Sequence, residues 1–155
     1  MPATVSPAGS LPNSAAVDSK PWWIERRFAL LTAGVLSVIL YGSLFPFDFH
    51  GNTRPLQTVW DIAQIRANRM DILANVLLYW PLGVSAVLAL RGWAMILRVA
   101  LVALCGAALS VSMEVIQIFE PARSVSVWDA YGNTAGVVLG AAMGVVLAAV
   151  RAPHG

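Results

Sequence analysis

Four long apolar runs constrain the fold of this chain more than any other feature. They cover approximately residues 28–45, 71–90, 94–119 and 128–150, and each is about as long as the ~20 residues that a membrane-spanning helix needs. Over the whole chain, 58% of the residues are hydrophobic and only 12% are charged, whereas roughly a quarter are charged in an ordinary soluble domain. The sequence therefore predicts an all-α integral membrane protein with four transmembrane helices.

The segments outside the apolar runs, the net charge and the cysteine count indicate the domain organisation and the surroundings of the chain. Residues 1–21 are rich in Pro, Ala and Ser without periodicity, which is typical of a disordered tail. We expect one membrane domain over residues 22–151 and a short tail at 152–155. The formal charge of +2 is too small and too dispersed to indicate a nucleic-acid partner, so the lipid bilayer is the expected surrounding. The one cysteine, Cys105, excludes an internal disulfide, and we expect it to be a buried packing residue.

Polar and charged side chains interrupt the apolar pattern at one end of three of the runs. Carboxylates at membrane depth are costly unless they are paired, hydrated or neutralised, so they usually mark a function. Glu114 and Gln117 lie three residues apart, and Asp129 and Asn133 lie four apart, so each pair occupies one helical face. We expect a single polar cluster, which also draws on the 71–90 run and the turn before residue 128. Its members are Asp71, Asn75, Glu114, Gln117, Arg123, Ser126, Asp129 and Asn133.

The make-up of this polar cluster limits its chemistry. Its three carboxylates face one cation, Arg123, so the cluster needs a protonated carboxyl group, another nearby arginine or a positively charged ligand. Carboxylate and amide oxygens permit Mg²⁺ or Ca²⁺ rather than zinc, without requiring a metal. No Ser-His-Asp or Cys-His set accompanies the cluster in the sequence, so no catalytic residue is assigned. Two interpretations stay open: a ligand-binding site, and a polar network that only fixes helix register.

Other patterns indicate how the helices are arranged. Gly136, Gly140 and Gly144 recur every four residues and predict a helix-packing face, because small residues let membrane helices approach closely. The second and fourth runs both open with Asp-x-x-x-Asn, and the runs before them end near a Phe and a Pro. This similarity indicates either two parallel helix-hairpin repeats or a chance match.

The basic residues beside the runs predict the orientation. Six of the ten Lys and Arg residues fall on the side of the two termini, namely Lys20, Arg26, Arg27, Arg91, Arg98 and Arg151. The other four fall on the opposite side. Since basic residues are enriched in cytoplasmic segments, this bias predicts that both termini are cytoplasmic. The polar cluster then lies at the outer face.

The polar cluster resembles the central motif of the VanZ-like family of small membrane proteins. The matching residues are Asp71, Asn75 and Pro81-Leu82-Gly83, followed by Glu114, Gln117, Phe119, Pro121, Arg123, Ser126, Asp129, Asn133 and Gly136. The resemblance covers most of residues 28–150. Ile72 is a departure, because the family usually has a basic residue there, and Arg69 is the candidate that supplies this charge instead.

The resemblance implies a four-span protein of the bacterial plasma (inner) membrane. It also implies a link to the cell envelope and, as in the founding member, to low-level teicoplanin resistance. We expect the polar cluster to bind an envelope or lipid headgroup, with a lipid-linked envelope precursor as a candidate partner. One alternative is a membrane enzyme acting on a lipid-linked phosphate or sugar, in which Asp71, Glu114 or Asp129 is acid, base or metal ligand and Arg123 holds the anion. The other alternative is a structural accessory subunit of an envelope complex.

Overall fold

The computed structural model describes residues 22–51, 68–120 and 125–150, which form four long helices. These are α1 (Trp22–Leu44), α3 (Arg69–Ala89), α4 (Met95–Gln117) and α5 (Val127–Val150). Each of the four is long and apolar enough to cross a membrane. The predicted all-α architecture with four spans is therefore confirmed for the described part of the chain. The two expected tails and Arg123 lie outside the described residues.

The helix ends differ from the predicted runs by a few residues. α1 begins at Trp22 rather than near Phe28, so it includes the charged residues that precede the apolar run. α3 begins directly after Asn68, whose side chain accepts a hydrogen bond from the Met70 N–H at 3.1 Å. A side-chain oxygen in this position satisfies a backbone donor that the first helical turn leaves without a partner. Asn68 is therefore the cap of α3, and Asp71 lies in its first turn.

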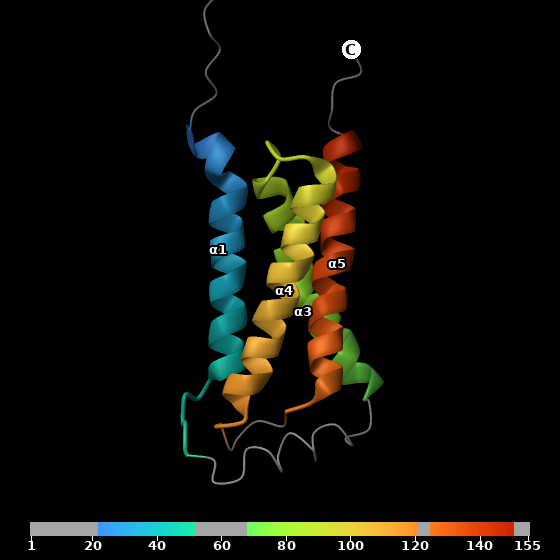
Figure 1. Ribbon diagram of the computed structural model, residues 1–155. Coiled ribbons are helices and arrows are strands. Elements are labelled where there is room, and N and C mark those ends of the chain that lie inside the picture. The colour runs from blue at the N-terminus through green and yellow to red at the C-terminus, as the bar shows by residue number, and fades with distance from the viewer. Residues whose placement is uncertain (1–21, 52–67, 121–124, 151–155) are drawn as a thin grey trace, which may run out of the picture.

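The helices alternate in direction along the bundle (Figure 1). α1 begins and α5 ends at one end of the bundle. At the other end, α1 and α4 end, and α3 and α5 begin. The described residues of the predicted polar cluster fall at the end of α4 and at or just before the starts of α3 and α5. The topology therefore gathers them at a single end of the bundle.

α3 and α5 make the most extensive helix contact in the structure. Gly136, Gly140 and Gly144 of α5 all lie against α3, and an added Cβ at Gly140 would overlap the backbone carbonyl of Trp80. In the opposite direction, Gly83 of α3 lies against the backbone of α5. Glycine allows this close approach because it has no side chain to separate the helices. The two helices form the most tightly packed part of the bundle.

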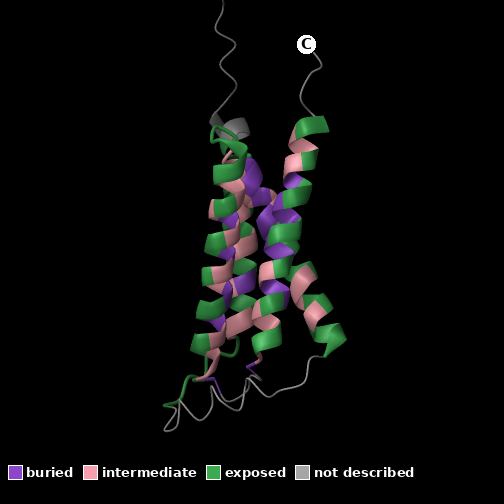
Figure 2. Ribbon diagram, turned by 45° about the vertical axis from the view of Figure 1, so that its right-hand side comes forward, coloured by how far each residue is buried: buried purple, intermediate pink, exposed green. Residues whose placement is uncertain are grey.

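α1 packs much less closely than the other helices. It mainly contacts α3 and makes only a small contact with α4. Of the α1 side chains that the structure describes, only Ile39 is buried, whereas Leu30, Val38 and Tyr41 are more than half exposed. Large apolar side chains face outward on the other helices too, and buried residues keep to the inner sides of the bundle (Figure 2). An apolar exterior of this kind suits surrounding lipid.

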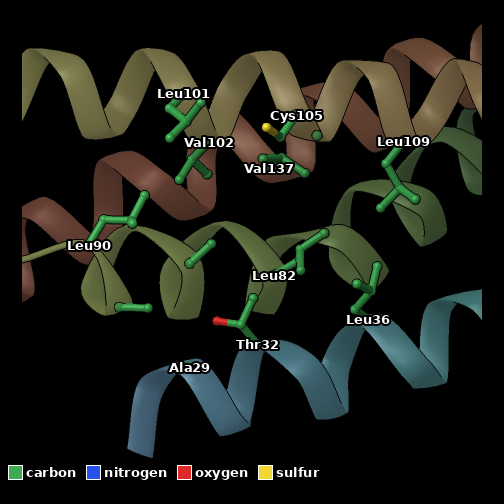
Figure 3. A pocket seen from close by; sticks show the side chains of 13 residues that line it. Ala29, Thr32, Leu36, Leu82, Leu90, Leu101, Val102, Cys105, Leu109 and Val137 are labelled. Atoms are coloured by element: carbon green, nitrogen blue, oxygen red, sulfur yellow. The ribbon is translucent and has the colours of Figure 1, made fainter. Parts of the chain in front are cut away.

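An open space beside α1 forms an apolar groove of about 420 Å³ (Figure 3). The groove is lined by Ala29, Thr32, Leu36, Leu82, Ala86, Ala89, Leu90, Leu101, Val102, Cys105, Gly106, Leu109 and Val137. Cys105 is exposed, so the expectation that it is a buried packing residue is wrong. The reason is the small contact between α1 and α4, which leaves this face of α4 uncovered.

Candidate functional site

A second space, the polar cavity, lies where residues of all four helices meet. Its volume is about 360 Å³, and it is lined by Val38, Gly42 and Ser43 of α1, Asn75, Leu78 and Tyr79 of α3, Met113, Glu114 and Gln117 of α4, and Asp129 and Asn133 of α5. These residues belong to the last turns of α1 and α4 and the first turns of α3 and α5. The alternation of helix directions is therefore what creates the cavity.

Five of the eight residues of the predicted polar cluster line this cavity. They are Asn75, Glu114, Gln117, Asp129 and Asn133. Glu114 and Gln117 are three residues apart in α4, and Asp129 and Asn133 are four apart in α5, so each pair lies on one helical face. In both helices that face is turned toward the cavity. Oxygen atoms of three helices thereby share one space.

Two other residues of the predicted cluster, Asp71 and Ser126, do not line the cavity. Asp71 is exposed and does not line the cavity, although it lies within electrostatic range of Asp129. The Ser126 hydroxyl accepts a hydrogen bond from the Trp128 N–H at 3.2 Å, directly before α5 begins. This is the contact of a helix N-cap, which gives Ser126 a structural role. Arg123 lies outside the residues that the structure describes.

Glu114 connects the cavity to the start of α5. Its Oε2 atom accepts a hydrogen bond from the Ser126 N–H at 3.1 Å, and the residue is partly buried. The first N–H groups of a helix have no partner within the helix, so a carboxylate there is favourable. Glu114 also lies within electrostatic range of Asp129. Two carboxyl groups in one restricted space repel each other when both are ionised.

Gln117 connects the cavity to α1. Its Nε2 atom donates a hydrogen bond to the backbone carbonyl of Ser43 at 2.8 Å. This carbonyl belongs to the last turn of α1, where carbonyl groups lack a partner within the helix. The hydrogen bond therefore holds the end of the loosely packed α1 against α4.

Two buried polar groups lie one helical turn deeper than Asn75 and Asp129. Asn133 is only 5% exposed, and its Oδ1 atom has no hydrogen-bond partner among the described residues. Tyr79 is 1% exposed, and its hydroxyl lies near Ser43 without reaching good hydrogen-bond geometry. Leaving a buried polar group without a partner costs about 1–3 kcal/mol. These groups are therefore available to a ligand in the cavity.

The sequence comparison agrees with this arrangement. Residues 28–148 match the VanZ/LLP1 family. The chain belongs to the VanZ/LLP1 family. The resemblance inferred from the polar motif is confirmed, and with its four spans this VanZ/LLP1 protein is a multi-pass membrane protein. No curated protein and no solved structure matches the chain.

The cavity of this VanZ/LLP1 protein also contains residues that sequence reasoning missed. Tyr79 follows Asn75 by four residues, so its position on the same helical face could have been predicted. Ser43 contributes a backbone carbonyl, for which the sequence carries no signal. Glu120, just after α4, was also missed; it does not line the cavity, but it is 1% exposed and both its carboxylate oxygens lack a hydrogen-bond partner in the described regions.

The positions of the carboxyl groups can be compared with the Mg²⁺ or Ca²⁺ site that the sequence permits. Within residues 22–51, 68–120 and 125–150, no three His, Cys, Asp or Glu side chains are grouped closely enough to hold a metal ion. The two carboxyl groups that line the cavity, Glu114 and Asp129, are accompanied there by amide and hydroxyl groups. Such a set can accept several hydrogen bonds from one polar ligand.

Proposed function

We propose that this VanZ/LLP1 protein binds the polar headgroup of an envelope lipid in the polar cavity. One observation carries the proposal: the buried Oδ1 atom of Asn133 has no partner among the described residues, in a cavity that also contains Glu114 and Asp129. A network that served only to fix helix register would pair such an atom, because buried polar groups are nearly always hydrogen-bonded. A headgroup that donates hydrogen bonds satisfies all three residues.

We also propose the location and the orientation in which this binding occurs. The protein lies in a bacterial plasma membrane with both termini in the cytoplasm, which the distribution of Lys and Arg supports. The polar cavity then lies near the outer face, where envelope precursors and glycopeptides act. Reporter fusions after Arg91 and after Arg123 should report opposite compartments, and agreement between them would refute this topology.

The proposed binding contributes to tolerance of glycopeptides of the teicoplanin type, and Glu114→Gln tests this. The substitution keeps an oxygen that can accept the Ser126 N–H, but it removes a carboxyl group that faces Asp129. Because like-charge repulsion is relieved, we expect the amount of membrane-inserted protein to stay constant or rise. Growth in the presence of teicoplanin should fall to the level of a strain without the protein. Both quantities are measured in the same cultures.

The matched control is Asp48→Asn, which neutralises a carboxylate outside the cavity. Asp48 is 71% exposed and lies near His50, so neither the protein amount nor teicoplanin tolerance should change. If Glu114→Gln and Arg123→Gln instead lower protein amount and tolerance together, the structural accessory alternative is correct. If a lipid product disappears in Glu114→Gln membranes, the enzyme alternative is correct.

A further inference from the structure

The apolar groove and the polar cavity adjoin each other along α1. On α4, Leu109 lines the groove and Met113 lines the cavity, and on α5 the corresponding residues are Val137 and Asn133. Residues four apart are neighbours on one helical face, so no turn of either helix separates the two spaces. Figure 3 shows Leu36 of α1 at the same end of the groove as Leu109. The groove and the cavity are therefore neighbouring spaces in the bundle, with no lining residue in common.

The groove has the dimensions and the lining of a site for a hydrocarbon chain. Along α4 it extends from Leu101 to Leu109, which is about 12 Å at the rise of an α-helix. The hydrocarbon core of a bilayer is ~30 Å thick, so one leaflet offers a chain about 15 Å. Lipid is as apolar as the groove, so a chain gains little free energy by moving from one to the other. Selectivity must therefore come from the headgroup.

The polar cavity is rich in hydrogen-bond acceptors. Glu114 and Asp129 supply carboxyl oxygens, and the Oδ1 atom of Asn133 is buried without a partner in the described structure. None of the described residues that line the cavity is Lys, Arg or His. Carboxylates repel an anionic headgroup, whereas a primary ammonium group carries three hydrogen-bond donors and no acceptor. The described lining of the cavity therefore suits a cation better than a phosphate.

We infer that the ligand is a cationic amphiphile. Its primary ammonium group lies in the polar cavity with Glu114, Asp129 and Asn133, and its hydrocarbon chain lies in the apolar groove beside α1. This inference rests on the proposed headgroup function and names the chemical class of its ligand. The positive charge of the ligand offsets the repulsion between the two carboxyl groups, which gives the cavity its selectivity.

The test uses the full chain in phosphatidylcholine nanodiscs with a hexadecylamine probe that carries a photoreactive diazirine on its chain. Mass spectrometry of the irradiated protein should locate crosslinks on groove residues of α1 and α4. Unlabelled hexadecylamine, hexadecanol and hexadecyl phosphate then compete with the probe. The ammonium group makes charged hydrogen bonds to the carboxylates, whereas hexadecanol makes only neutral ones and hexadecyl phosphate is repelled, so hexadecylamine should compete at about tenfold lower concentration than the other two.

Separate variants test the two parts of the site. Glu114→Gln combined with Asp129→Asn should weaken competition by hexadecylamine about tenfold, while thermal unfolding verifies that the variant is folded. Cys105→Trp fills the groove from an exposed position on α4 and should remove the groove crosslinks. Leu104→Trp is its matched control, because Leu104 is 70% exposed and is not part of the groove lining. That variant should crosslink like the unmodified protein.

Each contrary result shows which part of the proposal is wrong. If hexadecyl phosphate or hexadecanol competes as well as hexadecylamine, the cationic headgroup is wrong, but headgroup binding stands. If Cys105→Trp crosslinks normally in the groove, the chain does not lie there. If no competitor displaces the probe and the charge-neutralised variant behaves like the unmodified protein, the proposed headgroup function fails as well.

Discussion

Glycine has opposite effects in two regions of the bundle, namely the contact between α3 and α5 and the contact of α1 with the other helices. At the α3–α5 contact, an added Cβ at Gly83 or Gly140 would overlap backbone atoms of the opposite helix. On α1, an added Cβ at Gly34 or Gly42 would meet nothing within 4 Å. Glycine thus brings two backbones together in the first region, whereas in the second it leaves space beside the helix.

The difference divides the bundle into a close-packed part and a loosely attached helix. Besides the apolar groove and the polar cavity, a further apolar groove of about 510 Å³ lies between α1 and α3. Close packing maximises dispersion contacts, and every unfilled space forfeits some of them. The spaces beside α1 are therefore filled by lipid or ligand atoms rather than by protein side chains, so substitutions there should affect stability less than substitutions between α3 and α5. This comparison predicts where substitutions affect stability and where they affect binding.

The largest effect is expected for Gly140→Leu in the α3–α5 contact. The new side chain would overlap the Trp80 carbonyl and force the two helices apart. Overpacking of a rigid contact should lower the free energy of unfolding by about 3 kcal/mol or more. Thermal unfolding in detergent and the amount of membrane-inserted protein measure this loss.

Gly34→Leu on α1 is the matched control for that substitution. Since nothing lies within 4 Å of the added Cβ, and leucine favours a helix more than glycine by roughly 1 kcal/mol, stability should stay constant or rise slightly. Equal damage by both substitutions would show that α1 is packed as closely as α5.

A smaller effect is expected for Gln117→Leu, which removes the hydrogen bond to the Ser43 carbonyl. Hydrogen bonds between membrane helices contribute about 1 kcal/mol, so the loss should be of this size and confined to α1. Hydrogen exchange should become faster in the last turns of α1 and stay unchanged in α5. Ser112→Ala removes only a bond within α4, to the Ala108 carbonyl, and should leave exchange in α1 unaffected.

The smallest effect on stability is expected for Asn133→Leu in the polar cavity. The substitution removes a buried oxygen that has no partner among the described residues, and leucine is of similar size. The free energy of unfolding should stay constant or rise by about 1 kcal/mol, because the cost of an unpaired polar group disappears. Chemical denaturation measures the change. A loss of stability of that size would show that Asn133 belongs to a structural network.

Much of the fold was predictable because local patterns determine it. Four apolar runs of spanning length leave few alternatives to a helical membrane bundle. The glycines of α5 recur every four residues, a spacing that places them on one face of a helix. The looseness of α1 was not predictable. Its apolar composition resembles that of the other helices, and its partners depend on which surfaces fit together in three dimensions.

The candidate site was predictable where it depends on spacing within one helix. Glu114 with Gln117, and Asp129 with Asn133, follow directly from helical periodicity. The placement of Asp71 could not be read in this way, because position on a face does not determine whether a side chain reaches the cavity. Ser126 precedes α5, so helical periodicity does not place it. The burial of Cys105 was predicted wrongly for a related reason: an apolar neighbourhood in sequence does not show that another helix covers the residue.

Native mass spectrometry can test the claim that the polar cavity binds a lipid headgroup. The protein and its Asn133→Leu variant are extracted from the same host membranes and released from detergent in the instrument. We expect an amphiphile bound to the unmodified protein at about one copy per chain and absent from an equally stable variant. Identical bound lipid in both proteins, or none in either, would contradict the claim.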